Sequence, residues 1–301
     1  MRGVAVGLDA GGSSTTAVLS IDGEFARQIV GNGASPTALG VAPAAEIIAQ
    51  VISSLCESDR PSAIYVGAAG TSREGVAVEI ERRLTAQYPT ARIVIADDVR
   101  IALRAAVPSG DGVVLIAGTG SIAYAERSDE SFRCGGYGYL LGDDGSGYAL
   151  GSAAIKQALR SFDGRVPCDG FITGVLQQVG VDSQTDLLAK VYGGAQPIGL
   201  IASLAPFVIA SASDGERLAN RIVQSAALEL GDLIKAVVKA AGLQSAEAPI
   251  VLAGGLLREN SLLTFLLENR LQSDLPQMPL IKRPRQASYG ALELAQELLE
   301  K

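Results

Sequence analysis

The sequence predicts an α/β protein built from two similar lobes. Short runs of β-branched residues alternate with longer segments rich in alanine and leucine, which is the pattern of strands alternating with helices. The chain has 301 residues, 48% of them hydrophobic and 19% charged, which is enough for two domains with substantial cores. An imperfect internal repeat divides the chain into two halves of one design.

Each expected strand is a short apolar run that ends in small or turn-forming residues. These runs cover 4–9, 15–20, 63–69, 92–97, 112–118, 121–127 and 249–255. Each expected helix carries apolar residues at intervals of three and four. The helices cover roughly 42–56, 74–88, 99–106, 147–160, 199–212, 215–241, 259–269 and 288–300. Gly242 is a suitable stop for the longest of them.

The repeat consists of a strand–turn–strand segment followed by a strand–glycine–helix segment. The corresponding pairs are GVAVGLDAGGSSTTAVLS (3–20) with GVVLIAGTGSIAYAER (112–127), and IYVGAAGTSREG (64–75) with IVLAGGLLREN (250–260). Proline, serine and glycine cluster at 105–112, where a boundary is expected. We therefore expect an N-terminal lobe over 1–108 and a C-terminal lobe over 109–301, with the last helix packing back on the N-terminal lobe and a ligand held between the lobes.

Composition excludes several kinds of site and partner. The formal net charge of −7 argues against nucleic acid as a partner, although a phosphorylated ligand needs only local positive potential. The sequence contains no histidine, which removes Ser-His and Cys-His mechanisms and histidine-ligated metals. Three widely spaced cysteines, no signal-peptide pattern and no apolar run of about 18 residues favour a soluble, cytoplasmic protein without a membrane partner.

The turn between the first two expected strands carries residues suited to an anion. Gly11 and Gly12 let backbone N–H groups approach a ligand closely, and the hydroxyl groups of Ser13 and Thr15 can donate to phosphate oxygens. Asp9 suits a hydrated Mg²⁺ that would neutralise a phosphate, because Mg²⁺ prefers carboxylate and water oxygens.

The corresponding turn of the second half is IAGTGSIAY, with two glycines, Thr119 and Ser121. Either turn by itself is compatible with an ordinary tight hairpin. Two such turns at corresponding places favour phosphate binding. The chain has no GxxxxGKS or GxxxxGKT and no GxGxxG after a strand, which excludes a Walker-type P-loop and argues against a dinucleotide site.

Acidic residues follow the strand RIVIA. Asp97 and Asp98 lie at its C-terminal end, where open α/β sheets place their ligands. Asp97 is a candidate cap for the next helix. In a chain without histidine, a carboxylate here is the best-placed base for a hydroxyl group that attacks a phosphoryl group.

The densest glycine block is CGGYGYLLGDDGSGYALGSAAI, 134–155. Its stretch 135–147 contains six glycines and two adjacent aspartates, Asp143 and Asp144. Such density costs backbone entropy, so a purely structural loop is disfavoured, and the two carboxylates suit sugar hydroxyls or a metal. In PIVLAGGLLREN (249–260), paired glycines end a buried strand, which suits either a nucleoside or tight helix–sheet packing.

Taken in order, these motifs resemble the superfamily of actin, the heat-shock ATPases and the sugar kinases, and more narrowly the N-acetylglucosamine kinase and BadF/BadG ATPase family. The resemblance spans residues 4 to about 295, and its most specific part is GGxGxxxGDxGSG. It implies two ribonuclease-H-like lobes with Mg²⁺, ATP and an amino sugar between them.

The resemblance also assigns roles to individual residues. Asp98 falls on the catalytic aspartate that deprotonates the sugar 6-hydroxyl, and ASYGALELA (287–295) matches a closing helix near the nucleotide. The positions for ATP are Gly11, Gly12, Ser13, Ser14, Thr15, Gly118, Thr119, Gly120, Ser121, Gly254 and Gly255. The positions for the sugar are Ser35, Asp98, Thr119, Gly135, Gly136 and Asp143.

Some positions depart from the family pattern. Ser35 stands where the family has a sugar-contacting asparagine, and Asp97 where asparagine or a small residue often precedes the catalytic aspartate. Ala10 and Ser13 replace a common glycine and threonine, and Asp144 replaces a glutamate. These changes are mild for ATP binding and leave the identity of the sugar open.

The function expected from the resemblance is ATP-dependent phosphorylation of the 6-hydroxyl of N-acetylglucosamine. Glucosamine, N-acetylmuramic acid and a broader set of hexoses are alternative acceptors. A BadF-type ATPase that activates a redox enzyme is the alternative of another class, although Cys134 and Cys168 form no compact cluster motif. A homodimer is a family-level expectation.

Overall fold

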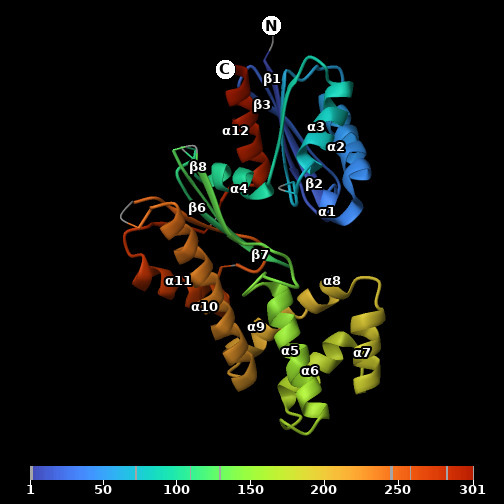
Figure 1. Cartoon of the computed structure of the whole chain (residues 1–301), viewed down its shortest axis with the longest axis vertical. Coiled ribbons are helices and arrows are strands. Elements are labelled where there is room, and N and C mark those ends of the chain that lie inside the picture. Colours follow the sequence, from blue (N-terminus) through green and yellow to red (C-terminus); the bar gives the residue numbers. More distant parts are fainter. Residues whose placement is uncertain are drawn as a thin grey trace. The chain divides into compact units, whose positions relative to one another are not determined.

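The chain is described from a computed structural model, shown in Figure 1. The structure describes residues 3–71, 73–108, 110–128, 130–244, 247–257, 259–282 and 284–300. It divides into two compact units, Met1–Gly112 with Arg283–Lys301, and Val113–Lys282. The division thus lies at Gly112 rather than at residue 108, and the C-terminal segment belongs to the first unit rather than to a lobe running over 109–301.

The first unit is a five-stranded sheet with helices on both faces. The strands are β1 (Val4–Ala10), β2 (Ser14–Ile21), β3 (Glu24–Asn32), β4 (Ala63–Ala68) and β5 (Arg92–Ala96), in the order β3-β2-β1-β4-β5. β1, β2 and β3 are antiparallel neighbours, while β4 and β5 run parallel to β1. One core packs the sheet against α2 (Val41–Cys56) and α3 (Val76–Gln87), and the other packs it against α4 (Asp98–Ala106) and α12 (Ala287–Glu300).

The second unit repeats this strand order and adds more helices. Its strands are β6 (Gly112–Ala117), β7 (Ser121–Arg127), β8 (Glu130–Gly135), β9 (Ile250–Ala253) and β10 (Leu280–Ile281), in the order β10-β9-β6-β7-β8. Its helices are α5 (Gly147–Phe162), α6 (Gly170–Val179), α7 (Gln184–Gly193), α8 (Pro197–Ala202), α9 (Ala205–Ser213), α10 (Arg217–Ala240) and α11 (Leu262–Asp274). The expectation of two similar α/β units is confirmed (Figure 1).

The strands that sequence periodicity missed all lie at sheet edges, and it also missed three helices. β3, β8 and β10 are edge strands, and along β3 exposed and half-buried residues alternate without a single buried one, so its apolar signal is weak. The short helix α1 (Pro36–Leu39) and the helices α6 and α7 were also missed. The expected helix 199–212 is two helices, α8 and α9.

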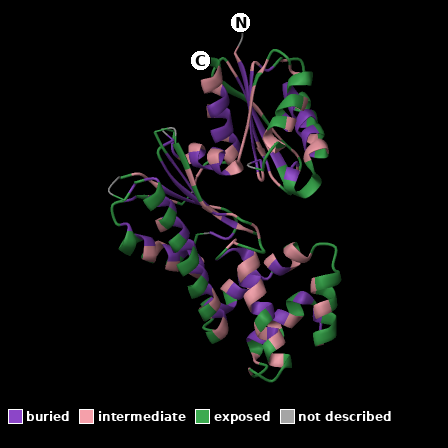
Figure 2. Cartoon of the chain, in the orientation of Figure 1, coloured by how far each residue is buried: buried purple, intermediate pink, exposed green. Residues whose placement is uncertain are grey.

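The C-terminal helix α12 lies directly on the first sheet, and two glycines allow this contact. A Cβ atom on Gly7 of β1 would lie 2.1 Å from the backbone nitrogen of Leu292, and one on Gly290 of α12 would lie 2.1 Å from the carbonyl oxygen of Ile101. Real Cβ contacts do not approach so closely, so α12 can reach β1 and α4 only because both positions are glycine. Figure 2 shows the buried side of α12 turned toward the strands.

Within the described ranges no single helix has the length and apolar composition needed to cross a membrane; Pro197–Ser213 and Arg217–Ala240 meet that criterion only as a pair bent by 114°.

Candidate active site

Three parallel strands of the first unit end at one edge of its sheet, and polar side chains stand at each end. Asp9 is the next-to-last residue of β1, Thr71 follows β4, and Asp97 and Asp98 follow β5. The Thr71 hydroxyl donates to Oδ1 of Asp97 at 2.8 Å, which joins the loops after β4 and β5. The edge therefore brings three carboxylates close together.

The carboxyl group of Asp98 is strongly perturbed. Burial, reinforced by the negative charges of Asp9 and Asp97, raises the pKa of Asp98 to about 6, although the backbone N–H groups of Val99 and Asp98 itself oppose the shift. Burial also raises the pKa of Asp9. Asp97 occupies the N-cap position of α4 without a side-chain capping bond, so capping does not explain the acidic pair.

The β1–β2 turn offers backbone donors that are free to bind a ligand. The N–H of Gly11 donates to the carbonyl of Ser14 at 3.0 Å. The N–H groups of Gly12 and Ser13 have no acceptor in the part of the chain that the structure describes. Two adjacent free N–H groups in an exposed turn form a concavity that suits an anion.

The hydroxyl groups of this turn differ in their access to solvent. Ser13 and Ser14 are exposed, whereas Thr15 is 0% exposed. The Thr15 Oγ1 atom has no hydrogen-bond partner among the described residues. The structure therefore favours Ser13 over Thr15 as a direct donor to a ligand.

Ser35 lies beside the same turn. The N–H of Ala34 donates to the carbonyl of Gly11 at 3.0 Å, and a Cβ atom on Gly33 would lie 2.2 Å from the carbonyl oxygen of Gly12. Ser35 itself is buried, only 4% exposed, and precedes α1 without a side-chain capping bond. The first unit therefore gathers its predicted site residues at one sheet edge.

The β6–β7 turn of the second unit rests on the start of α5. Gly118 accepts from the N–H of Gly147 at 2.8 Å, and Thr119 accepts from the N–H of Tyr148 at 3.1 Å. The N–H groups of Thr119 and Gly120 have no acceptor within the described ranges. This turn therefore presents the same pair of free donors as the β1–β2 turn.

Both aspartates of the glycine block are hydrogen-bonded to Ser121 of the second turn, Asp143 through its carboxylate and Asp144 through its backbone carbonyl. The Asp143 carboxylate accepts from the N–H of Ser121 at 3.4 Å, and the Ser121 hydroxyl donates to the backbone carbonyl of Asp144 at 2.7 Å. Burial raises the pKa of Asp143, while N–H groups of Ser121 and Gly138 oppose the shift. Asp143 has a left-handed backbone, with φ of 56°, and a Cβ atom on Gly120 would lie 2.7 Å from its Oδ2.

Arg133, which the sequence analysis did not single out, is hydrogen-bonded to the backbone at the start of the glycine block. The Arg133 guanidinium donates to the carbonyls of Gly135 at 3.4 Å and Gly136 at 3.0 Å, and lies 6.0 Å from the ring centre of Tyr137. Both glycines have positive φ, 73° and 70°. A lone arginine on an edge strand carries no motif, so only the folded contacts identify it.

The glycine pair after β9 packs against the strand that leads into the second turn. Gly254 has φ of 98°, and a Cβ atom there would lie 2.2 Å from the carbonyl oxygen of Ala117. A Cβ atom on Gly255 would meet open space. Packing of this loop against Ala117 therefore requires glycine at position 254. At position 255 the space beside the backbone is open. The residues gathered at this edge of the second sheet are Gly118, Thr119, Gly120, Ser121, Gly135, Gly136, Asp143, Gly254 and Gly255.

The donor set fits a magnesium ion held largely by a nucleotide. No group of three or more ligating side chains that could enclose a metal occurs in the described part of the chain. Mg²⁺ commonly takes only one or two carboxylates and keeps waters and substrate phosphates as its other ligands. Asp9, with Asp98 as an electrostatic neighbour, matches that requirement.

Comparisons with known proteins agree with this architecture. A model of the BadF/BadG/BcrA/BcrD ATPase family matches residues 6–295. An N-acetylmuramic acid/N-acetylglucosamine kinase of Clostridium acetobutylicum is 31% identical over 252 residues, which is 83% of this chain and 82% of that protein. An N-acetyl-D-glucosamine kinase of Dictyostelium discoideum is 29% identical over 312 residues, with 97% of each chain covered. A solved structure from Chromobacterium violaceum, provisionally described as an N-acetylglucosamine kinase, is 26% identical, with a TM-score of 0.77 over 98% of this chain and 99% of its own.

Proposed function

The chain belongs to the BadF/BadG/BcrA/BcrD ATPase family, and from this premise we propose that it is an ATP-dependent sugar kinase whose acceptor is the 6-hydroxyl of N-acetylglucosamine. The names of the two curated relatives support the amino sugar as the acceptor. The observation that carries the proposal is the acidic edge of the first sheet. There the negative charge of Asp9 helps to raise the pKa of Asp98, beside a turn whose backbone N–H groups are free to bind an anion.

In this proposal Asp98 is the general base. Its carboxylate accepts the proton of the 6-hydroxyl as the oxygen attacks the γ-phosphorus, and the bond from that phosphorus to the β,γ-bridging oxygen breaks to release ADP. A raised pKa suits this task, because a base titrating near neutral pH both stays ionised and accepts a proton readily.

The two glycine turns would hold the triphosphate. The free N–H groups of Gly12, Ser13, Thr119 and Gly120 donate to phosphate oxygens, with help from the exposed Ser13 hydroxyl. Asp9 would hold Mg²⁺ through water, and the ion when bound neutralises phosphate charge. Further ATP contacts are proposed for Gly11, Ser14, Gly118, Ser121, Gly254 and Gly255. Thr15, which sequence analysis also assigned to ATP, is buried beneath the turn and would support the turn without contacting ATP directly.

Each unit carries positions that the family resemblance assigns to the sugar. Ser35 and Asp98 come from the first unit, and Thr119 and Asp143 from the second. The remaining proposed contacts are the backbone groups of Gly135 and Gly136, which Arg133 holds in place.

A screen of acceptors tests the proposed function. ADP release is measured with N-acetylglucosamine, glucosamine, N-acetylmuramic acid and glucose, and we expect the highest kcat/KM with N-acetylglucosamine. The 6-deoxy analogue of N-acetylglucosamine is the matched control, because it lacks the acceptor oxygen and cannot be phosphorylated. ADP release that no sugar stimulates, from protein that contains iron, would instead support the redox activator.

The pH profile tests the role of Asp98 as a base. Because its pKa is raised to about 6, we expect kcat/KM to rise tenfold per pH unit below that value and to level off above it. The measurement covers about pH 5 to 8, with circular dichroism to verify folding at each pH. A profile that stays flat through this range would contradict the assignment.

Substitutions of Ser13 and Thr15 test which hydroxyl group of the first turn binds ATP. We expect Ser13→Ala to raise the KM for ATP by about tenfold, because a hydrogen bond to a charged phosphate is lost. Thr15→Val should change this KM by less than about twofold and raise the free energy of unfolding by about 1 kcal/mol, because it removes a buried hydroxyl without a partner.

The matched control for Thr15 is Thr264→Val. Thr264 is also buried, at 3% exposure, but its hydroxyl contacts the Ser261 hydroxyl at 2.9 Å. This variant should lower the free energy of unfolding and leave the KM for ATP unchanged. An equal rise in KM for the Ser13 and Thr15 variants would contradict the distinction between the two hydroxyls.

A further inference from the structure

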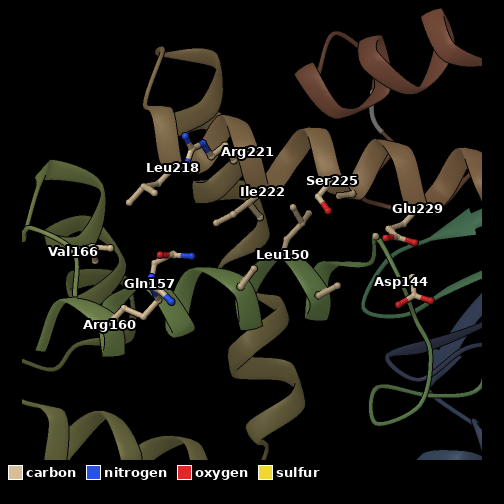
Figure 3. Close-up of a pocket in the computed structure, with 14 residues that line it drawn as sticks. Asp144, Leu150, Gln157, Arg160, Val166, Leu218, Arg221, Ile222, Ser225 and Glu229 are labelled. Atoms are coloured by element: carbon tan, nitrogen blue, oxygen red, sulfur yellow. The ribbon is translucent and has the colours of Figure 1, made fainter. Parts of the chain in front are cut away.

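The second unit contains a pocket that the proposed catalytic machinery does not use. It lies between α5 and α10, has a volume of about 490 Å³, and is drawn in Figure 3. This volume falls in the range of sites for small molecules. On the α5 side the lining runs from Asp144, just before α5, to Arg160 near its end, and on α10 it covers the first half of the helix, from Leu218 to Glu229.

The pocket has a basic end, an apolar middle and an acidic end. Figure 3 shows Arg160, Gln157 and Arg221 at one end, and Asp144 and Glu229 at the other. The apolar side chains of Leu150 and Ile222 lie between the two ends. A ligand that fits must therefore combine an apolar body with polar groups of defined charge.

The two arginines at the basic end have no side-chain partner among the residues that the structure describes. Neither Arg160 nor Arg221 makes an ion pair or a side-chain hydrogen bond within the described part of the chain. By contrast, Arg270 of the same unit pairs with Asp232 at 3.0 Å. Both arginines are exposed, and they place two guanidinium groups on the wall of one pocket in a chain with net charge −7.

We propose that this pocket binds a small organic anion. Its oxyanion group (carboxylate, sulfonate or phosphate) would be held by Arg160 and Arg221, because planar guanidinium groups match the geometry of such anions. Gln157 would donate a further hydrogen bond, and the apolar body would lie between Leu150 and Ile222. Hydroxyl or amino donors on the ligand would suit Asp144 and Glu229.

The pocket also reaches the candidate active site. Asp144 and Gly145 form its acidic end, and the carbonyl of Asp144 accepts the Ser121 hydroxyl of the second glycine turn at 2.7 Å. Gly145 packs tightly on α10, since a Cβ atom there would lie 2.6 Å from Leu230 Cγ. A bound anion would therefore contact the loop that carries Asp143, while occupying space of its own.

Calorimetric titration of the full chain with two matched probes tests the site. The probes are naphthalene-1-sulfonate and the uncharged 1-naphthalenemethanol, which share an apolar ring system. We expect one equivalent of the sulfonate to bind at least about tenfold more tightly than the alcohol, and this preference to disappear in the double variant Arg160→Gln, Arg221→Gln.

Two further variants separate charge from shape. Lys239→Gln removes an exposed cation from the far end of α10, outside the pocket, and should leave the preference intact. Ala153→Leu narrows the pocket from the α5 side without changing its charge, and should weaken the binding of both probes. Thermal unfolding verifies that each variant is folded.

Three results would overturn the proposal. The first is equal affinity for the two probes, as expected for the exposed apolar side chains of Tyr137, Leu140 and Leu141. The second is a double arginine variant that keeps the preference for the sulfonate. The third is displacement of the sulfonate by saturating Mg-ATP with N-acetylglucosamine, which would place it in the nucleotide or sugar site. Because the readout is binding, the test stands whether or not the chain phosphorylates the sugar.

Discussion

We expect Asp98→Asn to lower kcat by at least about a hundredfold, while the KM for ATP changes by less than about threefold. Asparagine keeps the size and polarity of the side chain but cannot accept the proton of the sugar hydroxyl. The measurement is steady-state ADP release with N-acetylglucosamine and Mg-ATP.

The matched control is the neighbouring Asp97→Asn. Asp97 accepts a hydrogen bond from Thr71 and is proposed neither as base nor as metal ligand, so its loss should lower kcat by less than about tenfold. An Asp98→Asn variant that keeps most of its turnover, or an Asp97→Asn variant that loses as much, would contradict the assignment.

Stability provides an independent readout of the same variant. The pKa of Asp98 is about 6 in the folded chain and near its ordinary value of 3.8 when unfolded, so the folded state binds more protons between these values and loses stability as pH rises through them. Asp98→Asn should therefore raise the free energy of unfolding at pH 7.5 by roughly 1–3 kcal/mol, and the gain should shrink toward pH 4. A stability effect with the opposite pH dependence would contradict the burial of the charge.

The second large effect is expected at Gly290→Ala, where α12 packs on α4. Alanine is favoured over glycine within a helix by about 1 kcal/mol, so propensity predicts stabilisation. We expect destabilisation by about 2–4 kcal/mol instead, because the new Cβ atom would meet the backbone of Ile101 and Ala105 and force α12 away from α4. Chemical denaturation measures the change.

Gly199→Ala is the matched control for this variant. Gly199 is an exposed residue of α8, and the nearest heavy atom to an added Cβ is Gln196 Oε1 at 3.9 Å, an ordinary contact. Its replacement should be neutral or stabilising by up to about 1 kcal/mol. If both variants stabilise the chain equally, α12 does not pack on the first sheet as described.

The buried parts of the fold could be predicted from the sequence, because their residues carry a strong periodic signal. β1, β4 and β6 are almost wholly apolar and end in small residues, and both sheets follow the repeat of hairpin and crossover. β3 could not be found in this way, because an edge strand with an exposed face needs little apolar sequence. Helix α6 did carry a signal, since Asp169 caps its start and Gly180 ends it in a left-handed conformation.

The candidate site was predictable where motifs carry it, and not where long-range contacts do. The glycine turns and Asp98 stand out as residue types at fixed spacing. The hydrogen bond from Thr71 to Asp97 joins residues 26 positions apart, and the contacts of Arg133 depend on the path of the glycine block. The different exposure of Ser13 and Thr15 follows from where the turn passes into β2, which spacing alone does not determine.

The return of the last helix to the first sheet has a consequence for biosynthesis. Domains commonly fold in the order in which they leave the ribosome. Here the N-terminal sheet lacks α12 until Ala287–Glu300 has left the ribosome, whereas Val113–Lys282 is continuous and emerges whole before that. The nascent protein is therefore expected to finish folding in reverse order, and a premature stop just after residue 282 would chiefly damage the domain that was translated first.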